Sequence, residues 1–410
     1  MSINEKALEL HKKNKGKISI ESKVNLENGN DLSLAYTPGV AEPCREIEND
    51  SEKVYEYTSK GNLVAVVSSG TAVLGLGDIG PEAALPVMEG KSVLFKKFAG
   101  IDAFPLCVGS TKVSEIVDFV KMLGPTFAGI NLEDISAPKC FEIENRLKKE
   151  TDMAIFHDDQ HGTAIVVLAG LLNALEVVEK NLSECKIVIN GAGAAATAVI
   201  KLLLEAGVKN ENIIVCDEFG TLYENRKENQ TDAEKYLAKI TNKNNKKTNI
   251  KNAIRNKDVF IGLSVGNVLN EKMIKSMNKN AVVFALANPI PEIDPKSAKK
   301  GGAREVATGR SDFANQINNV LAFPGVFRGA LDVRAKEINN EMKLAAAEAI
   351  SKIVENVRVD RIIPDPFDKR VVEEVAVAVA NTAIKTGVAR VEKSTEDIKQ
   401  NLKKILASVG

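Results

Sequence analysis

The sequence has little cysteine, no long apolar run and no excess of charge of either sign. Its 55 lysine and arginine residues balance 55 aspartate and glutamate residues, so the formal net charge is +0 at pH 7. A balanced chain has no bulk attraction for nucleic acid or for an anionic membrane surface. We therefore expect neither as a partner, and we expect any charged ligand to be held by local groups.

The few cysteines give no sign of a disulfide framework or a zinc site. They are odd in number, lie far apart and form no CxxC pair. We expect reduced cysteines in the core of a cytoplasmic protein. The five are Cys44, Cys107, Cys140, Cys185 and Cys216.

Membrane and secretion signals are also missing from the pattern. No uninterrupted apolar run approaches the roughly 18 residues of a membrane span. Residues 1–17 are polar and rich in lysine, without the apolar core of a secretory signal. The sequence thus predicts a soluble protein, and the absence of any repeat of fixed period argues against a solenoid or propeller.

The 410 residues are long enough for two hydrophobic cores. The pattern changes near residue 160, so we expect one domain over 1–160 and another over 161–410. In the first, short apolar segments at 63–67, 92–95 and 128–132 alternate with an amphipathic stretch at 113–123. This alternation predicts an N-terminal α/β domain.

The second part predicts a Rossmann-like, doubly wound parallel sheet. A buried helix at 162–179 precedes a strand at 186–190, a helix at 194–206 and a strand at 213–217, and further strands are expected at 259–263 and 282–287. The Lys/Asn-rich stretch 224–257 is a solvated insertion with a short helix at 233–240. Long C-terminal helices at 332–357 and 369–385 are separated by Pro364 and Pro366, and we expect them to pack on the sheet or on the other domain.

A glycine turn joins the first of these strands to its helix. In this GxGxxA pattern the first glycine permits a tight turn, the second admits a pyrophosphate, and the final alanine lets helix and strand pack closely. The helix N-terminus offers free N–H groups to the phosphates. The pattern favours dinucleotide binding, although a packing turn that binds nothing is the alternative. Its residues are Gly191, Ala192, Gly193, Ala194, Ala195 and Ala196.

Asp217 ends the next strand, about 20 residues further on, where a carboxylate meets the ribose hydroxyls. A carboxylate repels a 2′-phosphate, which favours NAD over NADP. Arg226 lies close enough in the chain to offset that repulsion. The sequence therefore predicts NAD or NADP, with NAD slightly favoured.

Two acidic clusters flank the expected domain boundary. Glu133 and Asp134 follow one apolar segment, and Asp158 and Asp159 follow another at 154–156. Glu133 and Asp134 can share a ligand only if the strand has ended, because adjacent strand residues face opposite sides. Glu133, Asp134 and Asp159 together suit Mg²⁺ or Mn²⁺. A solvated loop is the alternative for each pair, and a zinc site would need His157 and His161 as ligands.

Several motifs, in this order, resemble the malic enzymes in their short bacterial-type form. They occupy residues 36–40, 74–80, 88–91, 98–103, 131–134, 158–164, 191–196, 288–289 and 318–325. Larger members of that family carry an arginine just before the Leu-Gly-Leu-Gly-Asp segment, where this sequence has Val73. The residue that holds the second carboxylate of the substrate is therefore open.

The resemblance implies roles for individual residues. It makes Tyr36 the general acid and Lys91 the general base, with Asp158 beside the base. It makes Glu133, Asp134 and Asp159 the metal ligands of an N-terminal substrate domain, and it directs Asn288 and Asn319 toward the substrate, with Asn288 also beside the cofactor. It suggests a homodimer.

The resulting expectation is oxidative decarboxylation of malate to pyruvate and CO₂ with reduction of NAD(P). One alternative is a malolactic-type enzyme, which keeps its cofactor bound and yields lactate. Another is a dehydrogenase acting on a different 2-hydroxy acid or an amino acid. A third, from another class, is a nucleotide-sensing protein without catalysis.

Overall fold

Strand β1 (Leu63–Ser68) lies inside a four-stranded parallel sheet in the order β2-β1-β3-β4. The other strands are β2 (Asp102–Cys107), β3 (Gly129–Glu133) and β4 (Ala154–His157). Strands β1, β3 and β4 are buried along almost their whole length, as expected for parallel strands covered on both faces. The computed structural model describes residues 1–227 and 230–407.

Helices α5 (Pro81–Ala99), α6 (Val113–Met122) and α7 (Lys139–Glu150) alternate with these strands and complete the first lobe. The apolar segment noted at 92–95 is not a separate element, because it lies inside α5. The buried residues Ala84, Met88, Phe95 and Ala99 recur at helical spacing, a period that a four-residue window hides.

The second lobe has a six-stranded sheet in the order β10-β9-β8-β5-β6-β7, parallel except for β7. The predicted doubly wound sheet is confirmed, whereas β7 and β10 were missed. The strands are β5 (Ile187–Asn190), β6 (Ile213–Asp217), β7 (Gly220–Thr221), β8 (Val259–Gly262), β9 (Ala281–Ala285) and β10 (Ala303–Thr308). Its helices are α9 (Ala194–Glu205), α10 (Asp232–Ile240), α11 (Ile250–Ala253), α12 (Glu271–Lys275) and α13 (Pro295–Lys300).

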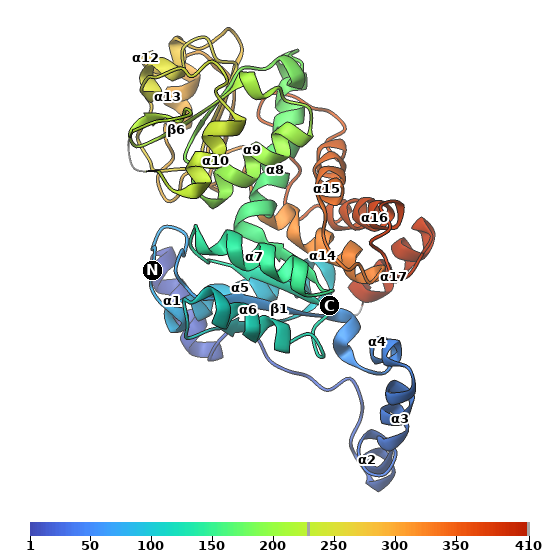
Figure 1. Ribbon diagram of the computed structural model, residues 1–410. Helices are drawn as coiled ribbons and strands as arrows, with labels where there is room; N and C mark the ends of the chain where they lie inside the picture. Colours follow the sequence, from blue (N-terminus) through green and yellow to red (C-terminus); the bar gives the residue numbers. More distant parts are fainter. Residues whose placement is uncertain (228–229, 408–410) are drawn as a thin grey trace.

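Helix α8 (Asp158–Val177) runs from the end of β4 in the first lobe to the second lobe (Figure 1). By length and composition alone it is the one helix of the described chain that is apolar enough to span a membrane. However, 72% of its most apolar window is buried inside the protein, against α9 and α15 among others. This burial is typical of a core helix, as predicted for 162–179.

The C-terminal helices are α14 (Phe323–Asp332), α15 (Asn340–Lys352), α16 (Arg370–Lys385) and α17 (Thr395–Ala407). The single helix predicted over 332–357 is wrong at its start, because Asn339 caps a separate helix by accepting from the Met342 N–H. In α14, Phe323 and Phe327 pack edge-on against Phe95 of α5. The C-terminal helices thus cover the first lobe as well, and a domain boundary at residue 160 remains a prediction.

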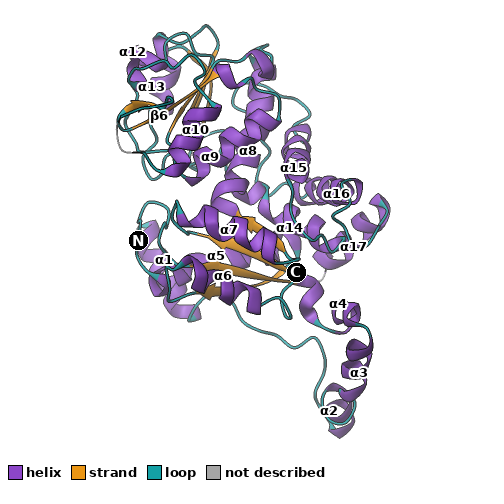
Figure 2. Cartoon of the chain, viewed as in Figure 1, coloured by secondary structure: helices purple, strands orange, loops and turns teal. Residues whose placement is uncertain are grey.

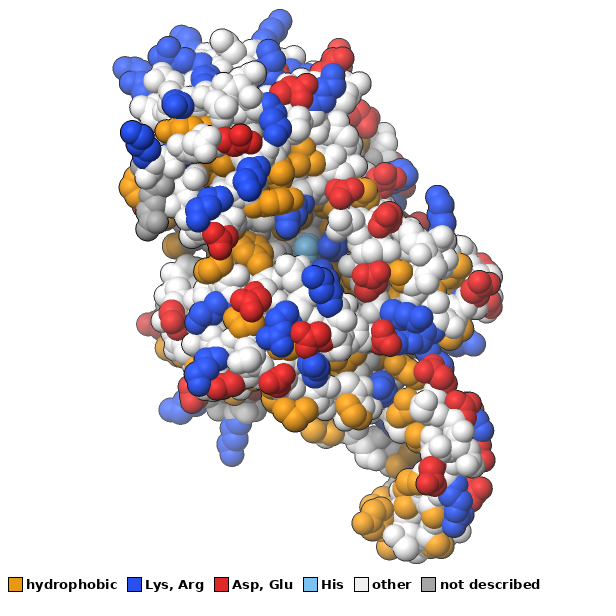
Figure 3. All heavy atoms as spheres, in the orientation of Figure 1, with side chains coloured by type: hydrophobic (Ala, Val, Ile, Leu, Met, Phe, Trp, Pro, Cys, Tyr) orange, Lys and Arg blue, Asp and Glu red, His pale blue; other side chains and the backbone are white. Residues whose placement is uncertain are grey.

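An arm at the N-terminal end of the chain stands away from both lobes (Figures 1 and 2). It contains α2 (Gly29–Ala35) and α3 (Ala41–Asn49), neither of which has a buried residue, and α4 (Val54–Tyr57) joins it to the first lobe. Helix α1 (Ile3–Asn14) precedes it. Apolar side chains gather at the end of the arm (Figure 3), among them Leu32, Leu34, Tyr36 and Val40.

Candidate active site

The acidic clusters meet because β3 and β4 are parallel neighbours. Leu132 pairs with His157 in the sheet register, so both strands end at the same edge. Glu133 closes β3, and Asp159 lies in the first turn of α8. One carboxylate oxygen from each of Glu133, Asp134 and Asp159 lies within 4.8 Å of the other two.

The chain leaves the strand at Asp134, whose φ of 51° is left-handed. The carbonyl oxygen of Asp134 accepts hydrogen bonds from the backbone N–H groups of Thr71 (3.0 Å) and Ala72 (3.1 Å). The Asp134 N–H donates to Asp159 Oδ2 at 2.8 Å. The strand has therefore ended at Asp134. This is the condition under which Glu133 and Asp134 can face one ligand.

Lys91 projects from α5 into this acidic group. Its Nζ lies 2.9 Å from Glu133 Oε1 and 2.6 Å from Asp158 Oδ2. The same nitrogen lies 4.3 Å from the centroid of the Phe323 ring, and Lys91 is 7% exposed. Asn319 donates to Asp158 Oδ2 at 2.6 Å. The structure therefore brings six predicted residues together: Lys91, Glu133, Asp134, Asp158, Asp159 and Asn319.

The site holds four carboxyl groups, those of Glu133, Asp134, Asp158 and Asp159. Among the described residues only one cationic side chain, Lys91, balances them. Burial raises the pKa of Asp134 to about 8, with the charges of Asp159 and Glu133 acting in the same direction. Burial also raises the pKa of Asp158 to about 8, against the opposing effect of Lys91. Burial by itself disfavours charge on Lys91, but Asp158 and Glu133 outweigh it and raise the pKa above its ordinary value. Lys91 is therefore an ammonium here.

These features fit a divalent cation. Three hard oxygen ligands converge, and Asp134 Oδ2 is buried without a hydrogen-bond partner among the described residues. The zinc alternative has no support, because His161 Nε2 lies 2.7 Å from Glu144 Oε1. Burial lowers the pKa of His161 to about 3. Glu133, Asp134 and Asp159 are the residues that would hold the metal.

The glycine turn has the geometry of a dinucleotide site. Gly191 has a φ of +127°, and a Cβ built on it would lie 2.4 Å from the Leu263 carbonyl oxygen, so glycine is required. A Cβ on Gly193 would meet no atom within 4 Å, which leaves open space beside that backbone. Ala196 is buried between helix and sheet. At the helix N-terminus, Ala194 packs against the core of the first lobe, so the turn faces that lobe.

Asp217 lies at the end of β6 as predicted, and its carboxylate is already engaged. Arg226 donates from Nη1 to Oδ1 at 2.9 Å and from Nη2 to Oδ2, and Oδ1 also accepts the Phe219 N–H. Both partners of this ion pair are largely buried. The repulsion that Asp217 would exert on a 2′-phosphate is therefore offset within the chain.

Two predicted residues are not joined to the acidic group in this structure. Tyr36 ends α2 on the arm, is 67% exposed and makes no contact with Lys91 in the described chain. Asn288 follows β9, and its Nδ2 lies beside Gly309.

Sequence reasoning missed two neighbours of the site. Asn131 donates to Glu133 Oε2 at 2.8 Å and so fixes that carboxylate. Its position two residues before Glu133 on one strand was a usable signal, because such residues share a face. Phe323, which lies under Lys91, had no local signal.

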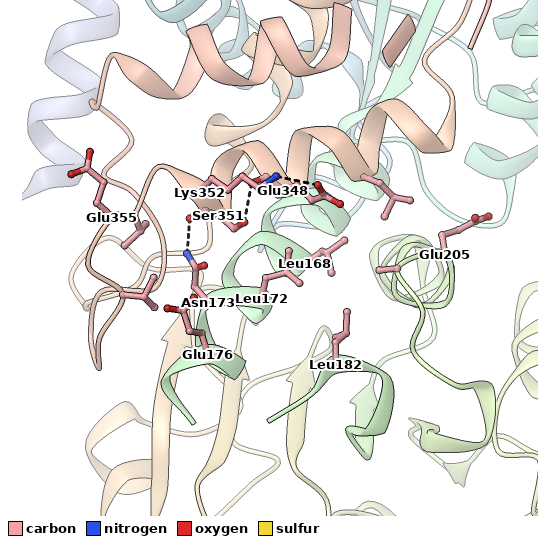
Figure 4. A pocket seen from close by; sticks show the side chains of 14 residues that line it. Leu168, Leu172, Asn173, Glu176, Leu182, Glu205, Glu348, Ser351, Lys352 and Glu355 are labelled. Carbon is pink, nitrogen blue, oxygen red and sulfur yellow. Dashed lines mark hydrogen bonds and ion pairs between the residues drawn. The ribbon is translucent and has the colours of Figure 1, made fainter. Parts of the chain in front are cut away.

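Other surface hollows lie away from this site. One, of about 660 Å³, is lined by Leu168, Leu172 and Leu182 with glutamates at its margin (Figure 4). There Asn173 donates to the Ser351 carbonyl oxygen at 2.9 Å. None of the predicted site residues lines this hollow, so we do not assign the chemistry to it.

A parallel-sheet dinucleotide fold that faces a buried lysine and a carboxylate triad defines a two-domain class of dehydrogenase. The family model "Malic enzyme, N-terminal domain" matches residues 13–148, and "Malic enzyme, NAD binding domain" matches residues 160–386. Together they span most of the chain.

Individual relatives agree. The "Bifunctional malic/malolactic enzyme" of Bacillus subtilis (strain 168) is 57% identical over 407 residues, 99% of each chain. The "NADP-dependent malic enzyme" of Escherichia coli (strain K12) is 49% identical over 391 residues, 91% of this chain and 51% of its own length. The crystal structure of malic enzyme from Pyrococcus horikoshii OT3 superposes with a TM-score of 0.96 at 52% identity, covering 99% of this chain and 96% of that one. The chain belongs to the malic enzyme family.

Proposed function

We propose that this chain oxidises malate and decarboxylates it to pyruvate and CO₂, with reduction of NAD(P) and with Mg²⁺ or Mn²⁺ bound by Glu133, Asp134 and Asp159. The observation that carries the proposal is the convergence of these three carboxylates with buried Lys91 at the strand edge facing the glycine turn. A dehydrogenase without a metal would not need such a group.

The cation, when bound, supplies Lewis acidity at the substrate oxygen where negative charge develops during loss of CO₂. The chain holds its ligands in place before binding: Asn131 fixes Glu133, and the Asp134 N–H fixes Asp159. The dinucleotide accepts hydride, and the open backbone at Gly193 admits its phosphates.

Lys91 is the group that moves the proton of the substrate hydroxyl. An ammonium cannot accept a proton, so its pKa must fall before it acts as a base. Glu133 is both a partner of Lys91 and a metal ligand. A cation held by Glu133 would offset the charge of one of the two carboxylates that raise the pKa of Lys91. Asp158 and Asn319 then keep the lysine side chain in position.

Tyr36 is the proton donor to the enolate carbon, and the arm determines how it reaches the site. Within one copy Tyr36 stands on a helix without buried residues, among exposed Leu32, Leu34 and Val40. Exposed apolar side chains on a projecting arm are typical of an interface with another copy. We therefore propose a homodimer in which the arm of each copy brings Tyr36 to the site of the other.

Mixing two inactive variants tests this arrangement. Tyr36→Phe and Lys91→Ala chains have complementary defects, so a heterodimer contains one site with both wild-type residues. We expect activity to reappear after co-refolding, up to about one quarter of the wild-type value if assembly is random and the sites act independently. If mixtures stay inactive although heterodimers form, the two residues belong to the same chain.

For the cofactor we propose NAD, with NADP also accepted. Asp217 ends β6, where we expect the ribose hydroxyls to bind, and Arg226 offsets its charge. A cytoplasmic location remains the prediction made from the sequence.

A malolactic activity is the second candidate function, because the Bacillus subtilis relative is named for both activities. The deciding assay follows absorbance of the reduced nicotinamide with malate and Mn²⁺, with NAD and NADP in parallel, and measures pyruvate and lactate. Net NADH with pyruvate supports the first function, whereas lactate without net NADH supports the second. No malate consumption under any condition refutes both.

A further inference from the structure

The substrate site lacks one expected positive charge. Larger members of the family carry an arginine just before the Leu-Gly-Leu-Gly-Asp segment, and Val73 stands in that region here, so the residue that holds the second substrate carboxylate is open. The loop that contains Val73 follows β1 and meets the loop after β9. A Cβ built on Gly75 would lie 3.6 Å from Pro289 Cδ and 3.9 Å from the Asn288 carbonyl oxygen.

Arg310 lies at this meeting point, but it comes from the second lobe. It follows β10, whose carboxyl end is at the same sheet edge as that of β9. Its Nη1 donates to the Pro289 carbonyl oxygen at 2.6 Å. A Cβ built on the preceding Gly309 would lie 2.6 Å from Asn288 Nδ2. Arg310 therefore neighbours both residues that the Val73 loop approaches.

The guanidinium is held in one orientation and retains donors for a ligand. Asp312 accepts from Nε and Nη2, both at 2.8 Å. An arginine has five N–H donors. The bonds to Asp312 and Pro289 use three, which leaves one on each terminal nitrogen within the described chain. A carboxylate can accept from donors on both terminal nitrogens in bidentate fashion.

The exposure and the charge of Arg310 are both consistent with binding a carboxylate. The Arg310 side chain is 37% exposed, so a ligand can reach it. Its hydrogen bonds to Asp312 raise the pKa of the guanidinium further above an already high value, so the charge is permanent. Arg310 lies in the segment that follows β10, and Asn319, which contacts Asp158, is the first residue after that segment.

We propose that Arg310 binds the malate carboxylate that is not held at the metal, and that Asp312 is a positioning residue for its guanidinium. The proposal rests on the malate activity proposed above. In this arrangement the second lobe supplies the arginine, so that the substrate bridges the two lobes.

The test compares holoenzyme variants with Mn²⁺ and NAD present. Arg310→Gln removes two charge-assisted hydrogen bonds, so we expect KM for malate to rise about 10- to 100-fold while kcat changes less. Arg310→Lys keeps the charge without the fork and should recover part of the loss. Arg304→Gln, an exposed position on β10, is the matched control and should behave as wild type.

A pair of inhibitors separates recognition from a structural defect. Tartronate has a second carboxylate, and glycolate lacks it. Arg310→Gln should raise the inhibition constant of tartronate at least about 10-fold and leave that of glycolate and the Kd for NAD unchanged. Asp312→Asn should give a smaller shift of the same kind.

Other outcomes overturn the assignment. Equal weakening of both inhibitors means that Arg310 supports the fold of the site, and loss of NAD binding places it at the cofactor. An unchanged constant for tartronate removes Arg310 from substrate binding. If wild-type protein does not consume malate, the proposed function fails, which is a different result.

Discussion

Replacing Lys91 by alanine tests the charge balance of the site without reference to turnover. The substitution removes the one ammonium that contacts Glu133 and Asp158, and both carboxylates are buried. Breaking one side of a buried ion pair costs about 3–5 kcal/mol of folding free energy. We expect a loss of that size for metal-free Lys91→Ala at pH 8, measured by urea denaturation.

The loss of folding free energy should depend on pH, and the carboxyl groups determine whether it grows or shrinks as pH rises. An acid whose pKa is raised in the folded state stabilises the fold less as pH rises. Lys91 lowers the pKa of Asp158 and of Glu133 against the stronger effect of burial. Without Lys91 these pKa values rise further, so the deficit of the variant should be smaller at pH 6 than at pH 8. Lys91 itself, with its pKa raised above 10.5, stays charged throughout this range.

Mn²⁺ should reduce the difference in folding free energy between the wild type and Lys91→Ala, because a cation at the carboxylates replaces part of the missing positive charge. Lys96→Ala is the matched control: it lies on the same helix, and its ion pair with Asp102 is partly exposed. A surface pair is worth about 0–1 kcal/mol, so this variant should show no Mn²⁺ effect of its own. If Lys91→Ala loses no more stability than Lys96→Ala at pH 8, the reasoning is refuted.

Three further substitutions probe other parts of the molecule. Asp159→Asn should abolish both Mn²⁺ binding, measured by calorimetry, and malate turnover; unchanged Mn²⁺ affinity contradicts the ligand set. Gly193→Ala should weaken NAD binding but leave the Tm unchanged, because no described atom lies within 4 Å of the added Cβ. Gly191→Ala should lower the Tm, because its Cβ would lie 2.4 Å from the Leu263 carbonyl oxygen. Burial raises the pKa of Glu305 to about 7, so its contribution to stability falls by roughly 3 kcal/mol as pH rises from about 4.5 to 7. Glu305→Gln should lack that slope in urea denaturation at pH 5 and pH 8, and an identical slope would place the titration elsewhere.

The sequence predicted the second lobe well because its signals are local. The apolar strand before Gly191 and the helix after it are set by residues within the same short stretch. Glu133 and Asp159 were also accessible, since each follows a strand and parallel strands end at one edge.

The features that the sequence did not predict depend on contacts between residues that are distant in the chain. Nothing near Lys91 in the chain shows that it enters an acidic group, and its role came from family resemblance alone. The bond from Asn319 to Asp158 joins residues 161 positions apart. The arm is a further case: Tyr36 is 67% exposed on it, and the second copy that we propose to cover it lies outside a single chain.

Gly162 shows how closely the two lobes are fitted around Asp158. It lies inside α8, where glycine disfavours a helix by about 1 kcal/mol relative to alanine. A Cβ at this position would lie 1.8 Å from Asp158 Oδ1 and 3.1 Å from Asn319 Cβ. The glycine is therefore required by space and not by a positive φ. It lets Asp158 contact Lys91 from the first lobe and Asn319 from the segment after β10 at once. Asp158 therefore links the position of Lys91 on α5 to that of Asn319 after β10 through one carboxylate oxygen.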